Sequence, residues 1–273
     1  MVMEDGSLLL RSAFLLSLIL LVGCALARKA PEPVVQTPGA TSFVREQLIF
    51  HSDFDLPRQH RLLDEVAALR VDIAGKLGIP ACDEPIHVYL FESADSYGEF
   101  AHKYFPRSVP RRAFFLETDT RLNVYAQWGD SVAEDLRHET THGYVHAAVR
   151  NVPLWLDEGI AEYFEVPRGR QGRNSPHMDL LAAHQGTGEW SPDLARLEQL
   201  TSAADMTQQD YAEAWLWVHL LLESTPERQT LLTVWLAELR RDGTSAPISL
   251  RLREIDSAPN RSATEHLQQI RGS

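Results

Sequence analysis

The stretch His138-Glu139-Thr140-Thr141-His142 is the strongest indication in this sequence of a fold and a kind of site. On a helix, residues four positions apart lie on one face about one turn from each other, so both histidines can reach one metal ion. Glu139 would lie beside that ion, where its carboxylate can accept a proton from a water molecule whose pKa the ion lowers to about 7. The stretch therefore predicts a zinc site with a general base next to it.

The sequence around this motif predicts two consecutive helices. Residues 131–150 contain no proline, and apolar residues recur along them at helical spacing. Asn151 and Pro153 end this helix, and a second helical pattern covers residues 153–164. The second helix carries Glu158, which is the candidate for a third metal ligand.

These motifs resemble those of the gluzincin metallopeptidases, which include the thermolysin-like and aminopeptidase-N-like enzymes. The segment Trp155-Leu-Asp-Glu-Gly-Ile-Ala161 is similar to the aminopeptidase pattern W-L-N-E-G-F-A, whose glutamate binds zinc. The resemblance implies that Zn²⁺ is held by His138, His142 and Glu158. It also implies that Glu139 acts as the general base.

Residues near the ligands refine this interpretation. The extended metzincin motif is not matched, because it requires glycine and histidine where this chain has Val145 and Ala148. His146 shares a helix face with His142, but the pair lacks the following glutamate, so we expect His146 to pack or to hydrogen-bond. Glu162 lies one turn after the third expected ligand, where related enzymes keep a carboxylate that hydrogen-bonds a metal-binding histidine. A solvated carboxylate on the helix surface is the alternative.

A further resemblance lies downstream, where Tyr211–Leu221 is similar to the aminopeptidase segment Y-E-K-G-A and its following apolar helix. In that family the tyrosine hydroxyl donates to the oxyanion of the tetrahedral intermediate, and the resemblance implies this catalytic role for Tyr211. Glu213 and Ala214 replace the lysine and glycine of the pattern, and the alternative is that Tyr211 only begins a core helix. We expect His219 on the same helix to be a core histidine.

The remaining patterns predict an α+β fold. Residues 59–77 form an amphipathic pattern typical of a helix, and strands are predicted at 86–91, 113–116 and 121–128. This order resembles a zincin-like catalytic core, with a small mixed sheet and the HExxH helix, over about residues 85–222. We expect the strand at 121–128 to border the cleft and to pair with substrate backbone, with an ordinary half-buried strand as the alternative.

The C-terminal part of the chain predicts a helical subdomain. Helical patterns cover residues 193–200, 211–223 and 227–241, and the polar tail from Ser257 is expected to fray. The segment 167–174 is rich in glycine and arginine, and we expect a surface loop there. Alternatively, its arginines meet a carboxylate of a substrate.

The N-terminus predicts export and attachment to a membrane. The apolar run from Leu8 to Val22 has the length of a signal-peptide core. It ends in Leu21-Val-Gly-Cys24, which resembles the lipobox of bacterial lipoproteins. The resemblance implies cleavage before Cys24, a lipid on that cysteine, and a place in the bacterial cell envelope, in the outer membrane facing the periplasm. An uncleaved anchor is the alternative.

Four regions follow from these patterns. We expect a lipoprotein signal peptide over residues 1–23 and a tether over 24–44, which is rich in proline, alanine and threonine. The zincin-like catalytic core would cover 45–170 and the helical subdomain 171–273.

Charge and cysteine content limit the classes of partner. The chain has 26 basic and 38 acidic residues and a formal net charge of −12, so we expect it to bind neither nucleic acid nor anionic lipid through its surface. Its two cysteines are Cys24 and Cys82. If Cys24 carries a lipid, no internal disulfide can form.

The expected function is zinc-dependent hydrolysis of peptide bonds in a peptide or protein substrate. The motif G-A-M-E-N, which binds a free amino terminus in aminopeptidases, is absent from the sequence, so endopeptidase action is favoured. One alternative is a peptidase-like zinc domain that binds envelope peptides or proteins with little turnover. Another is a structural lipoprotein in which zinc only joins two helices. The oligomeric state stays open.

Overall fold

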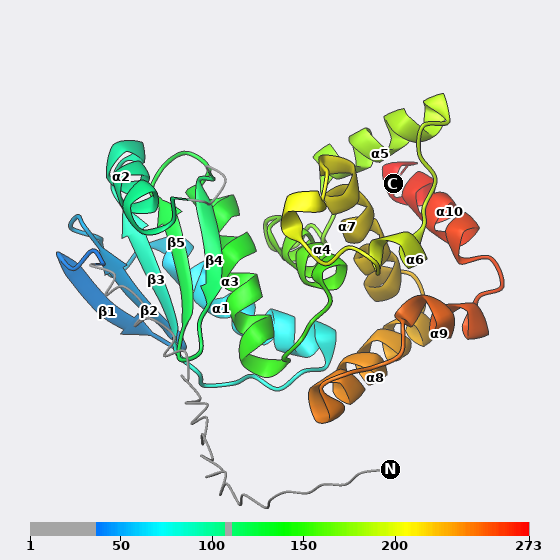
Figure 1. Cartoon of the computed structure of the whole chain (residues 1–273), viewed down its shortest axis with the longest axis horizontal. Helices are drawn as coiled ribbons and strands as arrows, with labels where there is room; N and C mark the ends of the chain where they lie inside the picture. The colour runs from blue at the N-terminus through cyan, green and yellow to red at the C-terminus, as the bar shows by residue number, and fades with distance from the viewer. Residues whose placement is uncertain (1–36, 107–110, 273) are drawn as a thin grey trace, which may run out of the picture. The chain divides into compact units, whose positions relative to one another are not determined.

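The computed structural model describes residues 37–106 and 111–272 (Figure 1). These residues fall within one compact unit. The expected signal peptide, the expected tether up to residue 36 and the lipidation site Cys24 lie outside the described residues. None of the described helices has both the length and the apolar character needed to cross a membrane.

The N-terminal half is built on a five-stranded mixed sheet with the order β1-β2-β3-β5-β4. Its strands are β1 (Thr41–Arg45), β2 (Leu48–Ser52), β3 (Ile86–Phe91), β4 (Ala113–Glu117) and β5 (Leu122–Gln127). The strands β2, β3 and β5 run parallel, and β1 and β4 pair antiparallel at the two edges.

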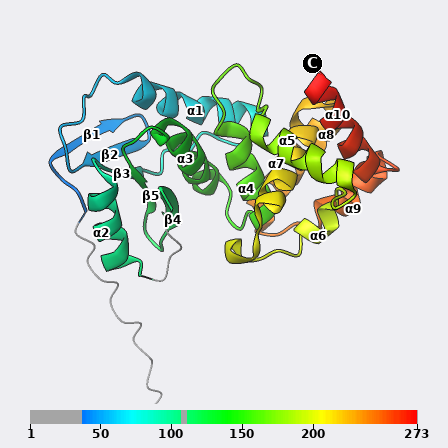
Figure 2. The ribbon, with the colours of Figure 1, turned by 90° about the horizontal axis from the view of Figure 1, so that it is seen from above.

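Helices cover both faces of this sheet, as Figure 2 shows. The helices α1 (Arg61–Leu77) and α3 (Val132–Ala148) pack on one face, where Phe50, Val88 and Val124 are completely buried. The short helix α2 (Ala94–Tyr104) packs on the other face against aromatic residues that include Phe91 and Tyr125. Side chains alternate between the two faces along a strand, so a single sheet supports both clusters.

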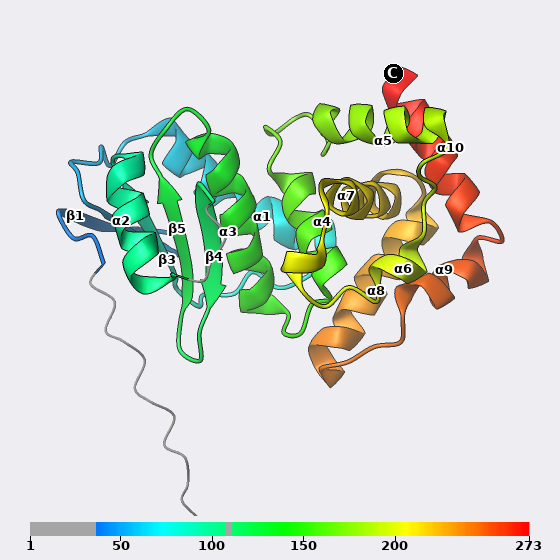
Figure 3. The same ribbon diagram turned by 45° about the horizontal axis from the view of Figure 1, so that its top comes forward.

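The C-terminal half is helical (Figure 3). It contains α4 (Leu154–Phe164), α5 (Ser175–Thr187), α6 (Leu194–Leu197), a 3₁₀ turn at Ala203–Asp205, α7 (Gln208–Glu223), α8 (Pro226–Asp242), α9 (Ile248–Ile255) and α10 (Pro259–Gly272). Together with the sheet, these helices confirm the predicted α+β class and the helical C-terminal part.

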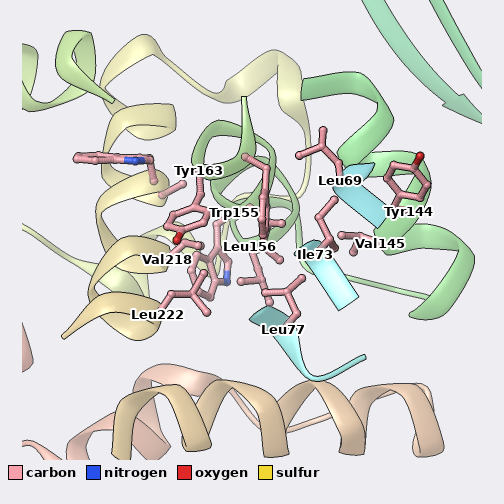
Figure 4. Close-up of a cluster of buried hydrophobic side chains, with 14 of the residues drawn as sticks. Leu69, Ile73, Leu77, Tyr144, Val145, Trp155, Leu156, Tyr163, Val218 and Leu222 are labelled. Atoms are coloured by element: carbon pink, nitrogen blue, oxygen red, sulfur yellow. The ribbon is translucent and has the colours of Figure 1, made fainter. Parts of the chain in front are cut away.

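Helix α4 connects the two halves through a shared core. Figure 4 shows side chains from α1, α3, α4 and α7 in one cluster, among them Ile73, Val145, Trp155 and Val218. A Cβ atom on Gly159 would lie 2.5 Å from a backbone oxygen of α7, so only glycine allows α4 to approach α7 this closely. The tight contact keeps α4 buried on both sides.

The prediction that the strand at 121–128 has an edge free to pair with substrate backbone is wrong. This segment forms β5, which lies between β3 and β4 and therefore has no open edge. The edge strand next to α3 is β4 instead. Strand order depends on pairings between distant segments, which the alternation of side chains along one strand does not specify.

Two boundaries also differ from the expected ones. Strand β1 begins at Thr41, inside the segment that was expected to be a tether. The tail after Ser257 is not frayed but forms α10, which buries Ala263, Leu267 and Ile270. These apolar residues recur at helical spacing and form one face of α10. The helix is stable because this face packs against the rest of the protein.

Candidate metal centre and its cleft

Helix α3 carries the HExxH stretch with little exposed surface. Its polar Thr140 and Thr141 are fully buried, and their hydroxyls donate to the carbonyls of Leu136 and Arg137 at 2.6 and 2.7 Å. Because these bonds are satisfied within the helix, the motif can lie against the sheet without a large desolvation cost.

A short turn brings α4 back beside α3. Asn151 adopts a φ of 58°, in the left-handed region that asparagine tolerates, and its side chain donates to the carbonyl of Gly243 at 3.2 Å. Pro153 then precedes the first turn of α4. Helix α4 is apolar on most of its surface, and this places Glu158 in a buried position facing α3.

His138, His142 and Glu158 converge on one point. The Oε2 atom of Glu158 lies 3.6 Å from Nε2 of His138 and 3.7 Å from Nε2 of His142. Ligand atoms at zinc-binding distances of about 2.0–2.2 Å in tetrahedral geometry would be about 3.4 Å apart. The three donor atoms therefore fit around one zinc ion, and two imidazoles with one carboxylate are donors that zinc accepts.

The other nitrogen of each imidazole faces a second carboxylate. Nδ1 of His138 lies 3.0 Å from Oε2 of Glu165, and Nδ1 of His142 lies 3.0 Å from Oδ2 of Asp157. A carboxylate at Nδ1 favours a proton on that nitrogen, which leaves Nε2 as the atom that binds a metal. The orientation of each ring therefore agrees with Nε2 as the candidate metal-binding atom of that histidine.

Glu162 does not have the partner that was expected. Its Oε2 atom lies 2.6 Å from Nε2 of His177 on α5, and the carboxylate that hydrogen-bonds His138 is Glu165. Glu158, Glu162 and Glu165 follow one another at helical spacing, so all three lie on one face of the chain. This acidic stripe was the signal in the sequence, but the choice of partner depends on the position of α5.

Negative charge surrounds the two imidazoles. Burial alone would lower the pKa of His138, but its hydrogen bonds to the carboxylates of Glu158 and Glu165 outweigh burial and raise this pKa well above its usual value. Burial is likewise outweighed for His142, whose pKa is raised by the nearby Asp157. The site therefore favours positive charge between the histidines and Glu158, which a divalent cation also supplies.

Glu139 lines the cleft next to these ligands and is only 8 % exposed. Burial raises the pKa of its carboxyl, and the neighbouring His138 and His142 oppose that rise. Among the described residues no donor hydrogen-bonds this carboxylate, so its oxygen atoms are available to a water molecule or a substrate.

His146 forms the hydrogen bonds that were expected of it. Nδ1 lies 2.6 Å from Oε2 of Glu117, and Nε2 lies 3.1 Å from Oδ2 of Asp157. Burial opposes the charged form, but the hydrogen bond to Asp157 outweighs it and raises the pKa of His146 to about 9. His142, His146 and Asp157 also form a group that could reach an ion, although both nitrogens of His146 already face carboxylates.

The candidate ligands His138 and Glu158 line a cleft of about 880 Å³. Tyr211, at the start of α7, lines this cleft together with Glu139 and the ligands His138 and Glu158. The Tyr211 oxygen accepts a hydrogen bond from Nη2 of Arg111 at 3.5 Å. The Tyr211 hydroxyl and the metal-binding atoms are thus presented to the same space.

Three other polar residues of the helical half lie away from the cleft. The hydroxyl of Tyr163 donates to Glu223 on α7, and Tyr163 borders a different cavity. His219 is 2 % exposed, and its Nδ1 atom lies 2.8 Å from Nε2 of His266, which agrees with the expected core position. The buried Glu213 accepts hydrogen bonds from four residues, Trp190, Asp193, Arg196 and Trp217, so it has a structural role.

Comparison with models of protein families found no match to this chain. A search of curated proteins also found none that matches it. The evidence for the candidate centre therefore comes from its own residues and their geometry.

Proposed function

We propose that the chain is a zinc-dependent peptidase of the gluzincin type, with a zincin-like catalytic core. The supporting observation is the convergence of His138 and His142 from α3 with Glu158 from α4. The same cleft presents Glu139 and Tyr211, which have the chemistry of a general base and a hydrogen-bond donor.

Glu139 and Tyr211 of the cleft each have a separate role in the proposed reaction. When bound, Zn²⁺ supplies Lewis acidity, which polarises the scissile carbonyl and makes water more acidic. Glu139 accepts a proton from the attacking water and passes it to the nitrogen of the leaving amine as the C–N bond breaks. Tyr211 donates its hydroxyl hydrogen to the oxygen on which negative charge develops. The hydrogen bond from Arg111 occupies the oxygen of Tyr211 and leaves its hydrogen available for this donation.

An extended peptide suits the border of the cleft. Among the described strands, β4 pairs only with β5, and its first residue, Ala113, lines the cleft. Backbone groups on a free strand edge can pair with an extended substrate, which favours cleavage within a chain. We therefore propose endopeptidase action with the substrate paired to β4.

The position of the ligands at the wall of an open cleft favours catalysis over a purely structural metal site. Structural zinc sites are closed by four protein ligands, whereas catalytic sites leave one position for water or substrate. Three donor atoms converge here, and the cleft lies next to them. This arrangement supports the peptidase proposal over a zinc ion that only joins α3 to α4.

We also propose that the protein is exported and anchored by a lipid at Cys24 in the bacterial cell envelope. The observation that supports this proposal is the lipobox-like segment Leu21–Cys24. Metabolic labelling with palmitate tests it, because Cys24→Ser should abolish the label. Persistent labelling of that variant contradicts the proposal.

The catalytic proposal is tested by measuring zinc and peptide hydrolysis in the same samples. We expect one zinc per chain, and we expect Glu139→Gln to keep the zinc while hydrolysis of a peptide library falls by about 10² or more. His146→Gln is the matched control, because His146 lies on the same helix and should leave zinc bound. Full turnover in zinc-loaded Glu139→Gln contradicts the mechanism. Zinc retention without hydrolysis in the unaltered protein would instead indicate a binding domain.

A further inference from the structure

Among the described residues, five arginines line the cleft, and their partners differ. They are Arg111, Arg112, Arg137, Arg170 and Arg173. Arg112 pairs with Asp135 at 2.9 Å, and Arg137 pairs with Glu65 at 3.0 Å. These two cations are therefore already neutralised by carboxylates of the protein.

Arg111 has no such partner among the described residues. Its guanidinium donates to the Tyr211 oxygen at 3.5 Å, and no described carboxylate forms an ion pair with it. Glu158 and Glu139 favour its charged form through space, but neither forms an ion pair with it.

Arg111 and Arg170 are both exposed, but Arg170 lies in the loop after α4, whereas Arg111 lies just before β4. Arg111 contacts Tyr211, whose hydroxyl we propose to donate to the oxygen of the scissile carbonyl. Arg111 therefore lies close to the expected position of the scissile bond. A guanidinium presents a planar fork of donors that matches a carboxylate with two parallel hydrogen bonds. The chain as a whole carries a net charge of −12, so selection of an acidic peptide requires a local cation of this kind.

We infer that Arg111 is a specificity-determining residue that binds a carboxylate of the substrate close to the scissile bond. That carboxylate is the side chain of an aspartate or glutamate, and the C-terminus of a short peptide is the other source that the test distinguishes. The inference depends on the proposed peptidase function for the scissile bond, but binding of the carboxylate can be measured without turnover.

Binding is measured with zinc-loaded Glu139→Gln protein and fluorescent peptide libraries of otherwise neutral residues. One library has a free C-terminus, the second is amidated, and the third is amidated and carries one glutamate at each position in turn. Fluorescence anisotropy gives the Kd of each library. The first two libraries test the C-terminal carboxylate, and the third tests an acidic side chain.

We expect at least one carboxylate-bearing library to bind about tenfold to a hundredfold more tightly than the neutral amidated library, as for a charge-assisted hydrogen bond. Adding Arg111→Gln should remove most of this preference, and Arg111→Lys should keep part of it. Arg112→Gln is the matched control, because its guanidinium is occupied by Asp135, and it should leave the preference intact. Melting temperatures show whether each variant is folded.

Equal binding of acidic and neutral libraries, or no binding of either, overturns the inference. A preference that survives Arg111→Gln in folded protein also overturns it. If the preference depends on Arg111 but the unaltered zinc protein hydrolyses no library, the catalytic proposal fails while the assignment of Arg111 stands.

Discussion

Replacing Glu165 by glutamine tests how the proposed metal centre is held. The Oε2 atom of Glu165 lies 3.0 Å from Nδ1 of His138, and its Oε1 atom accepts from Nδ2 of Asn174 at 2.7 Å. The carboxylate is thus held from one side and orients the imidazole on the other. Glutamine keeps the size of the side chain but removes the charge that makes His138 a stronger ligand.

Loss of a carboxylate that supports a metal-binding histidine typically weakens metal binding by about 10- to 100-fold, or about 1.4–2.7 kcal/mol. For Glu165→Gln we expect a value near the lower end, because an amide oxygen can still accept from Nδ1. Glu165→Ala should approach the upper end, since the hydrogen bond to His138 is lost as well. Zinc affinity is measured by competition with a chromophoric chelator at constant pH.

Glu162→Gln is the matched control, because Glu162 lies on the same acidic stripe but hydrogen-bonds His177. Burial raises the pKa of Glu162, and the hydrogen bond to His177 opposes that rise. We expect its zinc affinity to stay within about threefold of the unaltered protein. A larger loss of zinc in Glu162→Gln than in Glu165→Gln would refute the assignment of these two carboxylates.

Three further predictions concern catalysis, pH and packing. Tyr211→Phe should lower kcat by roughly 10² with little change in KM or melting temperature, and a normal kcat argues against an oxyanion role. The pKa of His219 is lowered to about 3, by burial and then by His266, and that of His266 is lowered to about 4, mainly by burial. The unfolded chain therefore binds more protons, so urea denaturation should show stability falling as pH drops from about 6.5 towards 4, with a smaller slope in His266→Gln. Gly159→Ala should destabilise the fold by about 1–3 kcal/mol, whereas Gly186→Ala, where a Cβ meets nothing within 4 Å, should be neutral or stabilising in the same denaturation assay.

Local spacing was sufficient to predict which histidines of the candidate metal site lie together. His138 and His142 share a helix face because they are four residues apart, whatever the helix packs against. The strand at Ile86–Phe91 and the boundaries of α1, α3 and α4 were also predictable, to within a few residues, from the periodicity of apolar side chains. The α+β class followed from the order of these elements.

Contacts between distant segments could not be predicted in this way. The choice of β4 as the edge strand depends on the pairing of β5 with β3. The contact between Arg111 and Tyr211 joins residues that are 100 positions apart, and the pairing of Glu162 with His177 depends on the packing of α5. Sequence patterns describe one element at a time, so they determined the residues that could bind a metal and the helices that carry them. Only the tertiary structure decided which carboxylate supports each histidine and which cation faces the cleft, because these choices depend on how separate elements pack together.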